Sequence, residues 1–269
     1  MQTEPLRRLG VLIVTLGALA LGVTAPAAHA QGFSAYVTPP RFELRVQPGT
    51  TLRQVFELQQ TGNARGQYRV YTNDWIFQPD QTVDFVDALT PESCRPWVAI
   101  ERREFAVEPG ARYRYRFEIT PPADTPAREC RFAIMVEGRD PTVGGNVQAA
   151  GRIGIVVYAA VGDAAPRLEL ADTRVETLNG QATPVLLVRN TGNAHGRLGG
   201  FVEGTDDAGQ RIEFGPADLP ILPGETRRVP LVALGEGKQA APTVRFPVRI
   251  QGKLEWGRNT LALDARFAP

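Results

Sequence analysis

The chain has 269 residues, 43% of them hydrophobic and 22% charged, and its 30 basic and 29 acidic residues give a formal net charge of +1. This near-neutral balance provides no overall field to attract nucleic acid or anionic lipid, so neither is an expected partner. The length is sufficient for two ordinary domains, each with its own hydrophobic core.

The N-terminus has the pattern of an export signal. Arg7 and Arg8 precede an apolar run over residues 9–23, and Ala28-His29-Ala30 is a small-x-small cleavage site. The run is short for a bilayer span, and no later stretch approaches the roughly 20 apolar residues of a transmembrane helix. We therefore expect residues 1–30 to be a signal peptide cleaved after Ala30, and the mature chain to be periplasmic without a membrane span. The alternative is an uncleaved N-terminal anchor.

The first half of the mature chain has the pattern of a β-sandwich. Segments rich in β-branched, aromatic and leucine residues recur every ten to fifteen positions between Pro, Gly, Asn and Asp, and no long stretch keeps a helical apolar stripe. The predicted strands are Ala35–Val46, Leu52–Gln60, Gln67–Phe77, Thr82–Val86, Trp97–Val107, Arg112–Thr120, Arg131–Glu137 and Gly151–Val161.

The second half repeats this pattern after Gly162–Pro166, where Gly-Asp-Ala-Ala-Pro separates two strand-like runs. Its predicted strands are Arg167–Thr177, Pro184–Arg189, Arg197–Gly204, Arg211–Phe214, Thr226–Leu234, Val244–Gln251 and Asn259–Phe267. This strand density is typical of immunoglobulin-like sandwiches. The predicted fold class is all-β, with two immunoglobulin-like β-sandwich domains in tandem over residues 31–162 and 163–269.

A short internal repeat supports the duplication. Gln60-Thr61-Gly62-Asn63-Ala64-Arg65-Gly66 is echoed 130 residues later by Asn190-Thr191-Gly192-Asn193-Ala194-His195-Gly196. Each copy lies between two predicted strands, so both are interpreted as the same turn, with Gly and Asn at the positive-φ positions. Pro-Gly pairs also precede strands at residues 48–49, 109–110 and 223–224.

The two cysteines, Cys94 and Cys130, both lie in the exported part, where an oxidising compartment lets a disulfide persist. A bridge would close a loop of about 37 residues and stabilise the fold by roughly 4 kcal/mol on the chain-entropy model. Two free thiols or a redox pair are the alternatives.

Groups for catalysis are scarce in the mature chain. Nucleophilic hydrolysis usually requires a histidine base, and His195 is the one histidine beyond the signal peptide. His195 is expected to be an exposed loop residue, because its counterpart in the repeat is Arg65. The acidic segment Asp206-Asp207-Ala208-Gly209 is interpreted as a hairpin turn, not a calcium loop. We expect no enzyme activity, no metal site and no cofactor.

Several segments together resemble the periplasmic pilus-chaperone (PapD-like) superfamily. They are Thr38-Pro39-Pro40-Arg41-Phe42-Glu43-Leu44, the run from Tyr68 to Trp75, Pro96-Trp97-Val98, and Phe105-Ala106-Val107-Glu108-Pro109-Gly110. The resemblance covers nearly the whole mature chain. It implies two immunoglobulin-like domains arranged as a boomerang, and a chaperone that caps pilus or fimbrial subunits by donor-strand complementation. It also implies a subunit client, and an outer-membrane usher as a further partner.

The resemblance also implies site residues. Arg41 lies where the family has its first basic anchor for the client's terminal carboxylate, and Arg152 is the candidate for the second. The alternative for Arg41 is a solubilising arginine on an edge strand. The donor-strand candidates are Val143, Val147, Ala149, Ile153 and Ile155.

The donor segment departs from the family pattern, because donor strands carry large apolar side chains at alternate positions. The residues before Arg152 are small, and buried methylenes contribute only about 0.8 kcal/mol each. Either the client groove is shallow, or the fold is kept without the function. The rival hypotheses are a structural or adhesive envelope protein with a permanent partner, and a carbohydrate-processing enzyme with two paired carboxylates.

Overall fold

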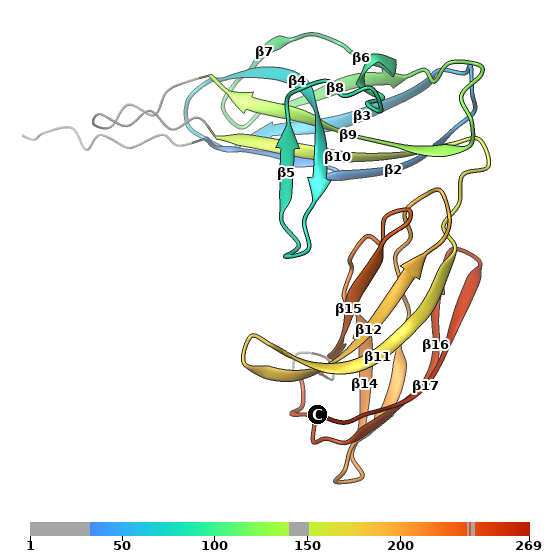
Figure 1. The fold of residues 1–269 in the computed structure, drawn as a ribbon. Coiled ribbons are helices and arrows are strands. Elements are labelled where there is room, and N and C mark those ends of the chain that lie inside the picture. Colours follow the sequence, from blue (N-terminus) through green and yellow to red (C-terminus); the bar gives the residue numbers. More distant parts are fainter. Residues whose placement is uncertain (1–32, 140–150, 236, 238–239) are drawn as a thin grey trace, which may run out of the picture.

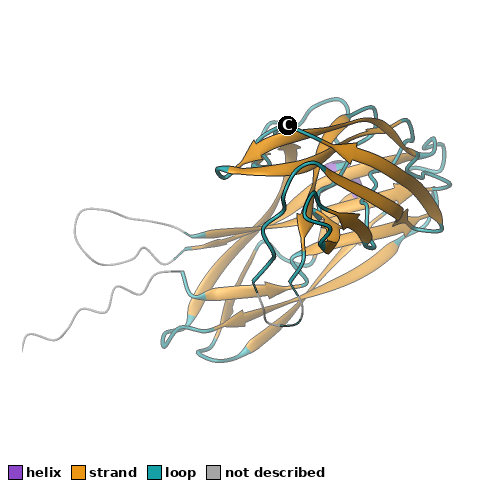
Figure 2. Ribbon diagram, turned by 90° about the horizontal axis from the view of Figure 1, so that it is seen from below, coloured by secondary structure: helices purple, strands orange, loops and turns teal. Residues whose placement is uncertain are grey.

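The computed structural model describes residues 33–139, 151–235, 237 and 240–269. The expected signal peptide (1–30) and the donor-strand candidates Val143, Val147 and Ala149 lie outside these residues. Within them the regular secondary structure is all strand apart from one short 3-10 turn, η1 (Arg95–Trp97) (Figure 2). The all-β class is confirmed.

The first sandwich contains two sheets that enclose one core. Its strands are β1 (Ala35–Thr38), β2 (Arg41–Val46), β3 (Leu52–Gln60), β4 (Gly66–Phe77), β5 (Val83–Val86), β6 (Val98–Ile100), β7 (Glu104–Val107), β8 (Arg112–Ile119), β9 (Arg128–Gly138) and β10 (Arg152–Val161). One sheet has the order β1-β3-β8-β6 and the other β2-β10-β9-β4-β5, with β7 also paired to β4. Phe56, Tyr115 and Phe132 are fully buried between them because alternate residues of each strand face inward.

The second sandwich follows a single hydrogen-bonded path, β11-β12-β15-β14-β13-β16-β17. Its strands are β11 (Leu168–Leu178), β12 (Gln181–Asn190), β13 (Val202–Thr205), β14 (Arg211–Pro216), β15 (Thr226–Ala233), β16 (Val248–Trp256) and β17 (Asn259–Phe267). Leu186, Phe214 and Phe267 are buried in a separate core. The two sandwiches meet at one end and enclose an angle (Figure 1), which agrees with the tandem fold and the bent arrangement expected.

The first predicted strand, Ala35–Val46, divides into two strands in different sheets. β1 pairs antiparallel with β3, whereas β2 pairs parallel with β10. The break falls at Pro39-Pro40, where the chain lacks two backbone N–H groups and cannot continue a ladder. This switch places Arg41 at the first position of an edge strand beside β10.

Three other predicted strands had wrong bounds. The segment Trp97–Val107 forms η1, β6 and β7, and its last two strands belong to different sheets. The segment Arg197–Gly204 is extended only from Val202 onwards. In the last case the strand begins after Pro247 and runs to Trp256, where the hydrophobic run had predicted Val244–Gln251. Hydrophobic composition alone therefore did not separate a strand from its flanking loop.

The repeated seven-residue segment forms equivalent turns in the two sandwiches. The Gln60 side chain donates to the Ala64 carbonyl at 2.7 Å, and the Asn190 side chain donates to the Ala194 carbonyl at 2.8 Å. The following threonine N–H binds the residue just before the first strand of its own sandwich, Ser34 in one case and Arg167 in the other. A Pro-Gly turn then closes each arrangement, through the N–H of Gly110 or Gly224.

The expected positive-φ geometry of these turns was wrong. Neither glycine nor asparagine in the two copies has a positive φ, in contrast to Gly110 and Gly224 of the Pro-Gly turns. The glycines serve close packing instead. A Cβ at Gly192 would lie 2.3 Å from the Ala165 carbonyl oxygen, and one at Gly62 would lie 3.0 Å from Ser34 Cβ.

Candidate functional site at the junction of the two sandwiches

One face of the β2-β10-β9-β4 sheet is directed towards the second sandwich. Alternation along β10 sends Ile153, Ile155 and Val157 into the first core, and Val156 and Tyr158 to the opposite face. We call this opposite face, together with the side chains of the second sandwich that meet it, the junction. Arg41 is in register with Val156, so β2 contributes Arg41 and Glu43 to the same face.

The strand β10 has an open edge near its beginning. It pairs with β9 over its whole length, from Arg152 to Val161, but with β2 only from Val156 onwards. In the part of the chain described, no strand is therefore paired with the outer edge of Arg152–Ile155. The Val156 N–H reaches the Pro40 carbonyl on this side. Alternate N–H groups of a strand share one edge, so those of Gly154 and Arg152 point the same way.

Arg41 and Arg197 both bind the carboxylate of Asp218 in the junction, and we call these three residues the clamp. Arg41 Nη1 lies 3.3 Å from one oxygen of Asp218, and Arg197 Nη1 lies 2.9 Å from the other. Their Nε atoms each lie 3.1 Å from Glu43. Arg41 comes from the first sandwich and Arg197 and Asp218 from the second, so the clamp joins the two. Burial opposes ionisation of Asp218, but the two guanidinium groups outweigh it and lower the pKa of this carboxyl group.

His195 lies next to this clamp and is buried between two carboxylates. Its Nδ1 is 2.5 Å from Glu129 Oε2, its Nε2 is 3.5 Å from Glu43 Oε1, and its ring stacks on Tyr158 with centroids 3.8 Å apart. Its side chain is only 9% exposed. The expectation of an exposed loop residue was therefore wrong: the turn that carries Arg65 on the free surface of the first sandwich carries His195 into the junction of the second.

The charges around His195 favour its protonated form. Burial alone would lower the pKa of His195, but the hydrogen bonds and charges of Glu129 and Glu43 outweigh it and raise that pKa above 6.5. In return, the hydrogen bond from His195, with the charges of Arg197 and Arg41, lowers the pKa of Glu43 to about 2. Burial raises the pKa of Tyr158 to about 12, so its hydroxyl group stays neutral.

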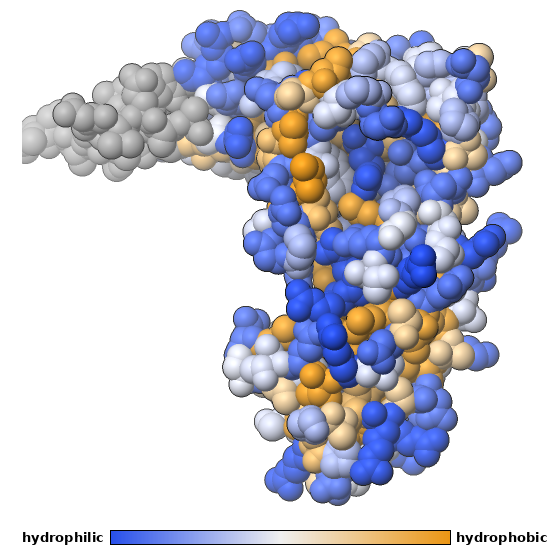
Figure 3. All heavy atoms as spheres, viewed as in Figure 1, coloured by the Kyte–Doolittle hydropathy of each residue, from blue (hydrophilic) through white to orange (hydrophobic). Residues whose placement is uncertain are grey.

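A second contact between the sandwiches lies at the tip of the β4–β5 hairpin. The Arg227 guanidinium stacks on the Phe77 ring at 4.1 Å and donates to the Gln78 carbonyl at 3.4 Å. Leu222 packs against the hydrophobic cluster that contains Trp75 and Tyr158. Hydrophobic side chains gather along this hairpin towards the second sandwich (Figure 3). The junction is therefore held at two separated places.

A hollow of about 320 Å³ lies beside His195. Arg45, Glu129 and Tyr158 line it from the first sandwich, and Arg197 and Trp256 from the second. Arg45 donates to the Ala164 carbonyl at 3.2 Å, in the segment that connects the sandwiches. The hollow is thus an extension of the junction and belongs to the same site.

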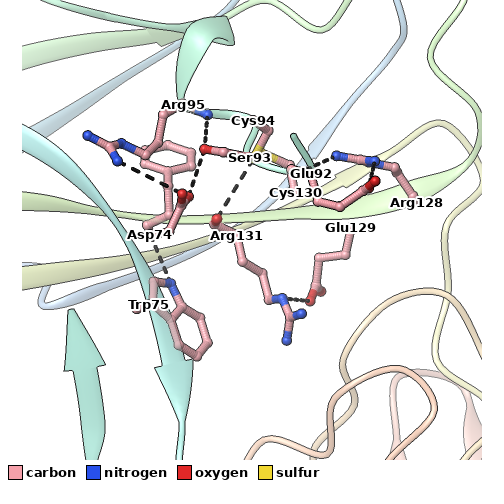
Figure 4. The surroundings of a disulfide bond; sticks show 11 residues. Asp74, Trp75, Glu92, Ser93, Cys94, Arg95, Arg128, Glu129, Cys130 and Arg131 are labelled. Atoms are coloured by element: carbon pink, nitrogen blue, oxygen red, sulfur yellow. Dashed lines mark hydrogen bonds and ion pairs between the residues drawn. A yellow bond between two sulfur atoms is a disulfide. The ribbon is translucent and has the colours of Figure 1, made fainter. Parts of the chain in front are cut away.

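The disulfide Cys94–Cys130 ties the loop before η1 to β9, with its Cα atoms 5.8 Å apart (Figure 4). Closing this loop contributes roughly 4 kcal/mol to stability on the chain-entropy model. In Figure 4 Ser93 donates to Asp74 at 2.9 Å, beside the bridge. Cys130 adjoins Glu129 in the sequence, so the bridge also fixes the part of β9 that contacts His195.

The predicted site residues are distributed unevenly. Arg41 lies in the junction, but Arg152 lies four residues before the position in register with Arg41, about 13 Å along the strand, and is paired in register with Glu137. The structure therefore does not bring Arg41 and Arg152 together. Ile155 is fully buried in the first core and Ile153 packs against it. Arg197, which the prediction missed, shares a carboxylate with Arg41; no motif marked it.

The acidic segment Asp206–Gly209 forms a hairpin turn. Asp206 Oδ1 accepts hydrogen bonds from the N–H groups of Ala208 and Gln210 at 2.9 and 2.8 Å, and the turn joins β13 to β14. This segment is therefore the hairpin turn that was predicted.

Among the described residues, no group of three or more His, Cys, Asp or Glu side chains could hold a metal ion. In the same residues no helix has the length and hydrophobicity needed to span a membrane.

Comparison with known proteins gives likeness at the level of structure only. No protein-family profile and no curated protein sequence matches the chain. The solved structures that match include the E. coli chaperone DraB, at 15% identity and a TM-score of 0.46, covering 88% of this chain and 97% of that one. The Pseudomonas aeruginosa CupB2 chaperone matches at 14% identity and a TM-score of 0.45, covering 87% and 100%. The chain is similar in fold to fimbrial chaperones.

Two of the similar structures contain a chaperone together with another protein. One is the CsuC–CsuE chaperone-tip adhesion subunit pre-assembly complex of Acinetobacter baumannii, at 13% identity and a TM-score of 0.44, covering 87% and 98%. The other is a chaperone-tip adhesin complex of CFA/I fimbriae, at 11% identity and a TM-score of 0.47, covering 88% and 99%.

Proposed function

We propose that this protein is a periplasmic chaperone, exported through a cleaved signal peptide, that caps pilus, fimbrial or related surface subunits for assembly at the outer membrane. The observation that carries the proposal is the open edge of β10 at Arg152–Ile155, which leads directly to Arg41. An unpaired edge next to a fixed cationic group is a site for an added strand that ends in a carboxylate.

The proposed client strand runs in the same direction as β2. β2 runs parallel to β10 and begins at Arg41. A client strand that continued this edge in the same direction would end next to Arg41, so its terminal carboxylate would be the group that Arg41 meets. Backbone hydrogen bonds to Gly154 and Arg152 would provide most of the affinity, because these residues offer little apolar side chain on that face.

The carboxylate of Asp218 supports Arg41 and Arg197 as the anchoring pair. Each arginine binds a different oxygen of Asp218, so the pair is already spaced for a carboxylate. The Asp218 side chain is 67% exposed and can yield its place to a client carboxylate. Arg152 lies further back along the edge, where it would contact the client strand before its end.

The test is purification of the tagged protein from the periplasm of its own host, followed by mass spectrometry of what accompanies it. A stoichiometric small β-rich exported subunit is expected with the wild type and with Arg53→Gln, a control on the other sheet, where Arg53 pairs with Glu118. Arg41→Gln is expected to lose the subunit. Equal recovery with Arg41→Gln would refute the anchor. An envelope scaffold partner would favour the structural or adhesive alternative, and a bare monomer would refute capping.

A further inference from the structure

The contacts of His195 all cross between the sandwiches. Glu129 Oε2 accepts from the His195 backbone N–H at 2.9 Å and lies 2.5 Å from ring Nδ1. Nε2 faces Glu43 at 3.5 Å. Both carboxylates belong to the first sandwich and His195 to the second. Three contacts of a single residue therefore link β9 and β2 to the turn Asn190–Gly196.

The state of the ring decides whether both carboxylates can be bound. In a neutral imidazole only one nitrogen carries a proton, and the close Glu129 oxygen favours the tautomer in which Nδ1 keeps it and donates to Glu129. Nε2 then presents a lone pair to the Glu43 carboxylate, which is a repulsive contact. In the charged ring both nitrogens donate, and the contact with Glu43 becomes a charge-assisted hydrogen bond.

The other charges around the ring are already paired. Glu43 on β2 also pairs with Arg41 and Arg197, and Arg197 pairs with Asp218. On β9, Arg131 Nε lies 3.8 Å from Glu129, and on β10 the neutral Tyr158 hydroxyl lies 3.3 Å from Arg197. The remaining charge that lines the adjoining hollow is Arg45 on β2. His195 is thus the group whose ionisation near neutral pH changes the balance of the cluster.

We propose that His195 is a proton-operated latch between the two sandwiches. With the ring protonated, His195 bridges Glu129 and Glu43 and holds the sandwiches in one relative orientation. With the ring neutral, the Glu43 half of the bridge opens and the junction loosens, while the Arg41–Asp218 and Arg197–Glu43 pairs and the Arg227–Phe77 contact keep the sandwiches together. The latch needs no client, so it stands or falls independently of the proposed chaperone function.

The test is a nuclear magnetic resonance titration of the purified protein, without a histidine tag, from pH 5 to pH 9. The His195→Gln variant identifies the imidazole signal of His195 by its loss. The expected midpoint lies above 6.5, the usual value, and Glu43→Gln is expected to move it down towards 6.5. Backbone 15N relaxation then reports how tightly the two sandwiches tumble together, and this coupling is expected to decrease above the midpoint.

The matched control is Glu92→Gln, which removes an exposed carboxylate that pairs with Arg128 within the first sandwich. It should titrate and tumble as the wild type does, whereas His195→Gln should tumble the same way at every pH. The proposal is overturned by a wild-type midpoint at or below 6.5, or by tumbling that does not change across the midpoint. Glu43 is 44% exposed, so Glu43→Gln should fold normally if His195→Gln does not.

Discussion

The two copies of the seven-residue turn share a backbone and differ in what their sixth residue meets. Arg65 is 62% exposed and pairs with Glu108 on the same sandwich, whereas His195 is 9% exposed and contacts two carboxylates of the other sandwich. The hydrogen bonds that the two copies share tie each turn to the residue just before the first strand of its sandwich. The same turn therefore supports the fold in both copies and takes part in the junction only in the second.

The largest expected effect comes from removing the hydrogen bonds of the Asn190 side chain in the second turn. Asn190 is fully buried; its side chain donates to Ala194 and Ile221 and accepts from Arg167 and Gly192. Asn190→Ala leaves four backbone groups without this partner, of which those of Ala194 and Ile221 are buried, and should cost about 4 kcal/mol. Hydrogen–deuterium exchange should show faster exchange throughout the second sandwich.

The equivalent change in the first turn should cost less. Gln60 donates to Ala64 and accepts from the Tyr68 hydroxyl group, so Gln60→Ala leaves fewer buried groups unsatisfied and should cost about 2 kcal/mol. Urea unfolding of both variants measures the difference. Equal losses would mean that the two turns support their sandwiches equally and that the extra bonds of Asn190 contribute nothing.

The second comparison is between the glycines of the two turns. A Cβ at Gly192 meets backbone atoms of Ala165 and Arg167 at 2.3 and 2.5 Å, and the chain cannot move away without disturbing the connection between the sandwiches. At Gly62 the nearest atom is Ser34 Cβ at 3.0 Å, and a small shift relieves it. We expect Gly192→Ala to cost about 2 to 3 kcal/mol and Gly62→Ala under about 1 kcal/mol. Thermal unfolding measured by circular dichroism checks both values, and the reverse order would contradict this explanation.

The pH dependence of stability should separate the turns further. The pKa of His195 is raised by folding, so its contribution is complete below 6.5 and is lost as the pH rises through the higher pKa of the folded state. The pKa of Glu43 is lowered to about 2, so its contribution is complete above 4.5 and is lost as the pH falls towards 2. Together they favour the folded state most between about pH 4.5 and 6.5.

Urea unfolding at pH 5.5 and pH 8.5 measures this dependence. His195→Gln should reduce the loss of stability at pH 8.5 relative to pH 5.5. Arg65→Gln should leave the loss unchanged, because Arg65 pairs with Glu108 on the first sandwich and takes no part in the junction. If the two variants showed the same pH dependence of stability, the contacts of His195 in the junction would make no contribution to it.

The sequence predicted the fold class, most strands and the acidic hairpin turn, because alternating hydrophobic residues and turn residues are local signals. It did not predict that Pro39-Pro40 moves the strand to another sheet, since the sheet that a strand joins depends on distant residues. It also gave no sign of Arg197 or of the burial of His195. Both depend on how the two sandwiches meet, and two polar residues in a turn carry no local signature of a partner 66 or more residues away.

The smallest expected effect is at Arg65, and it provides the reference for the whole comparison. Arg65 and Glu108 are 62% and 69% exposed, and an ion pair of this kind contributes between 0 and about 1 kcal/mol. Arg65→Gln should therefore change the free energy of unfolding by less than the experimental error of the value measured for Gly62→Ala. Any residual difference should disappear in 0.5 M salt, because exposed ion pairs are screened. A larger or salt-independent loss would show that the sixth position supports the turn itself, and the effects of His195→Gln would then have to be divided between the turn and the junction.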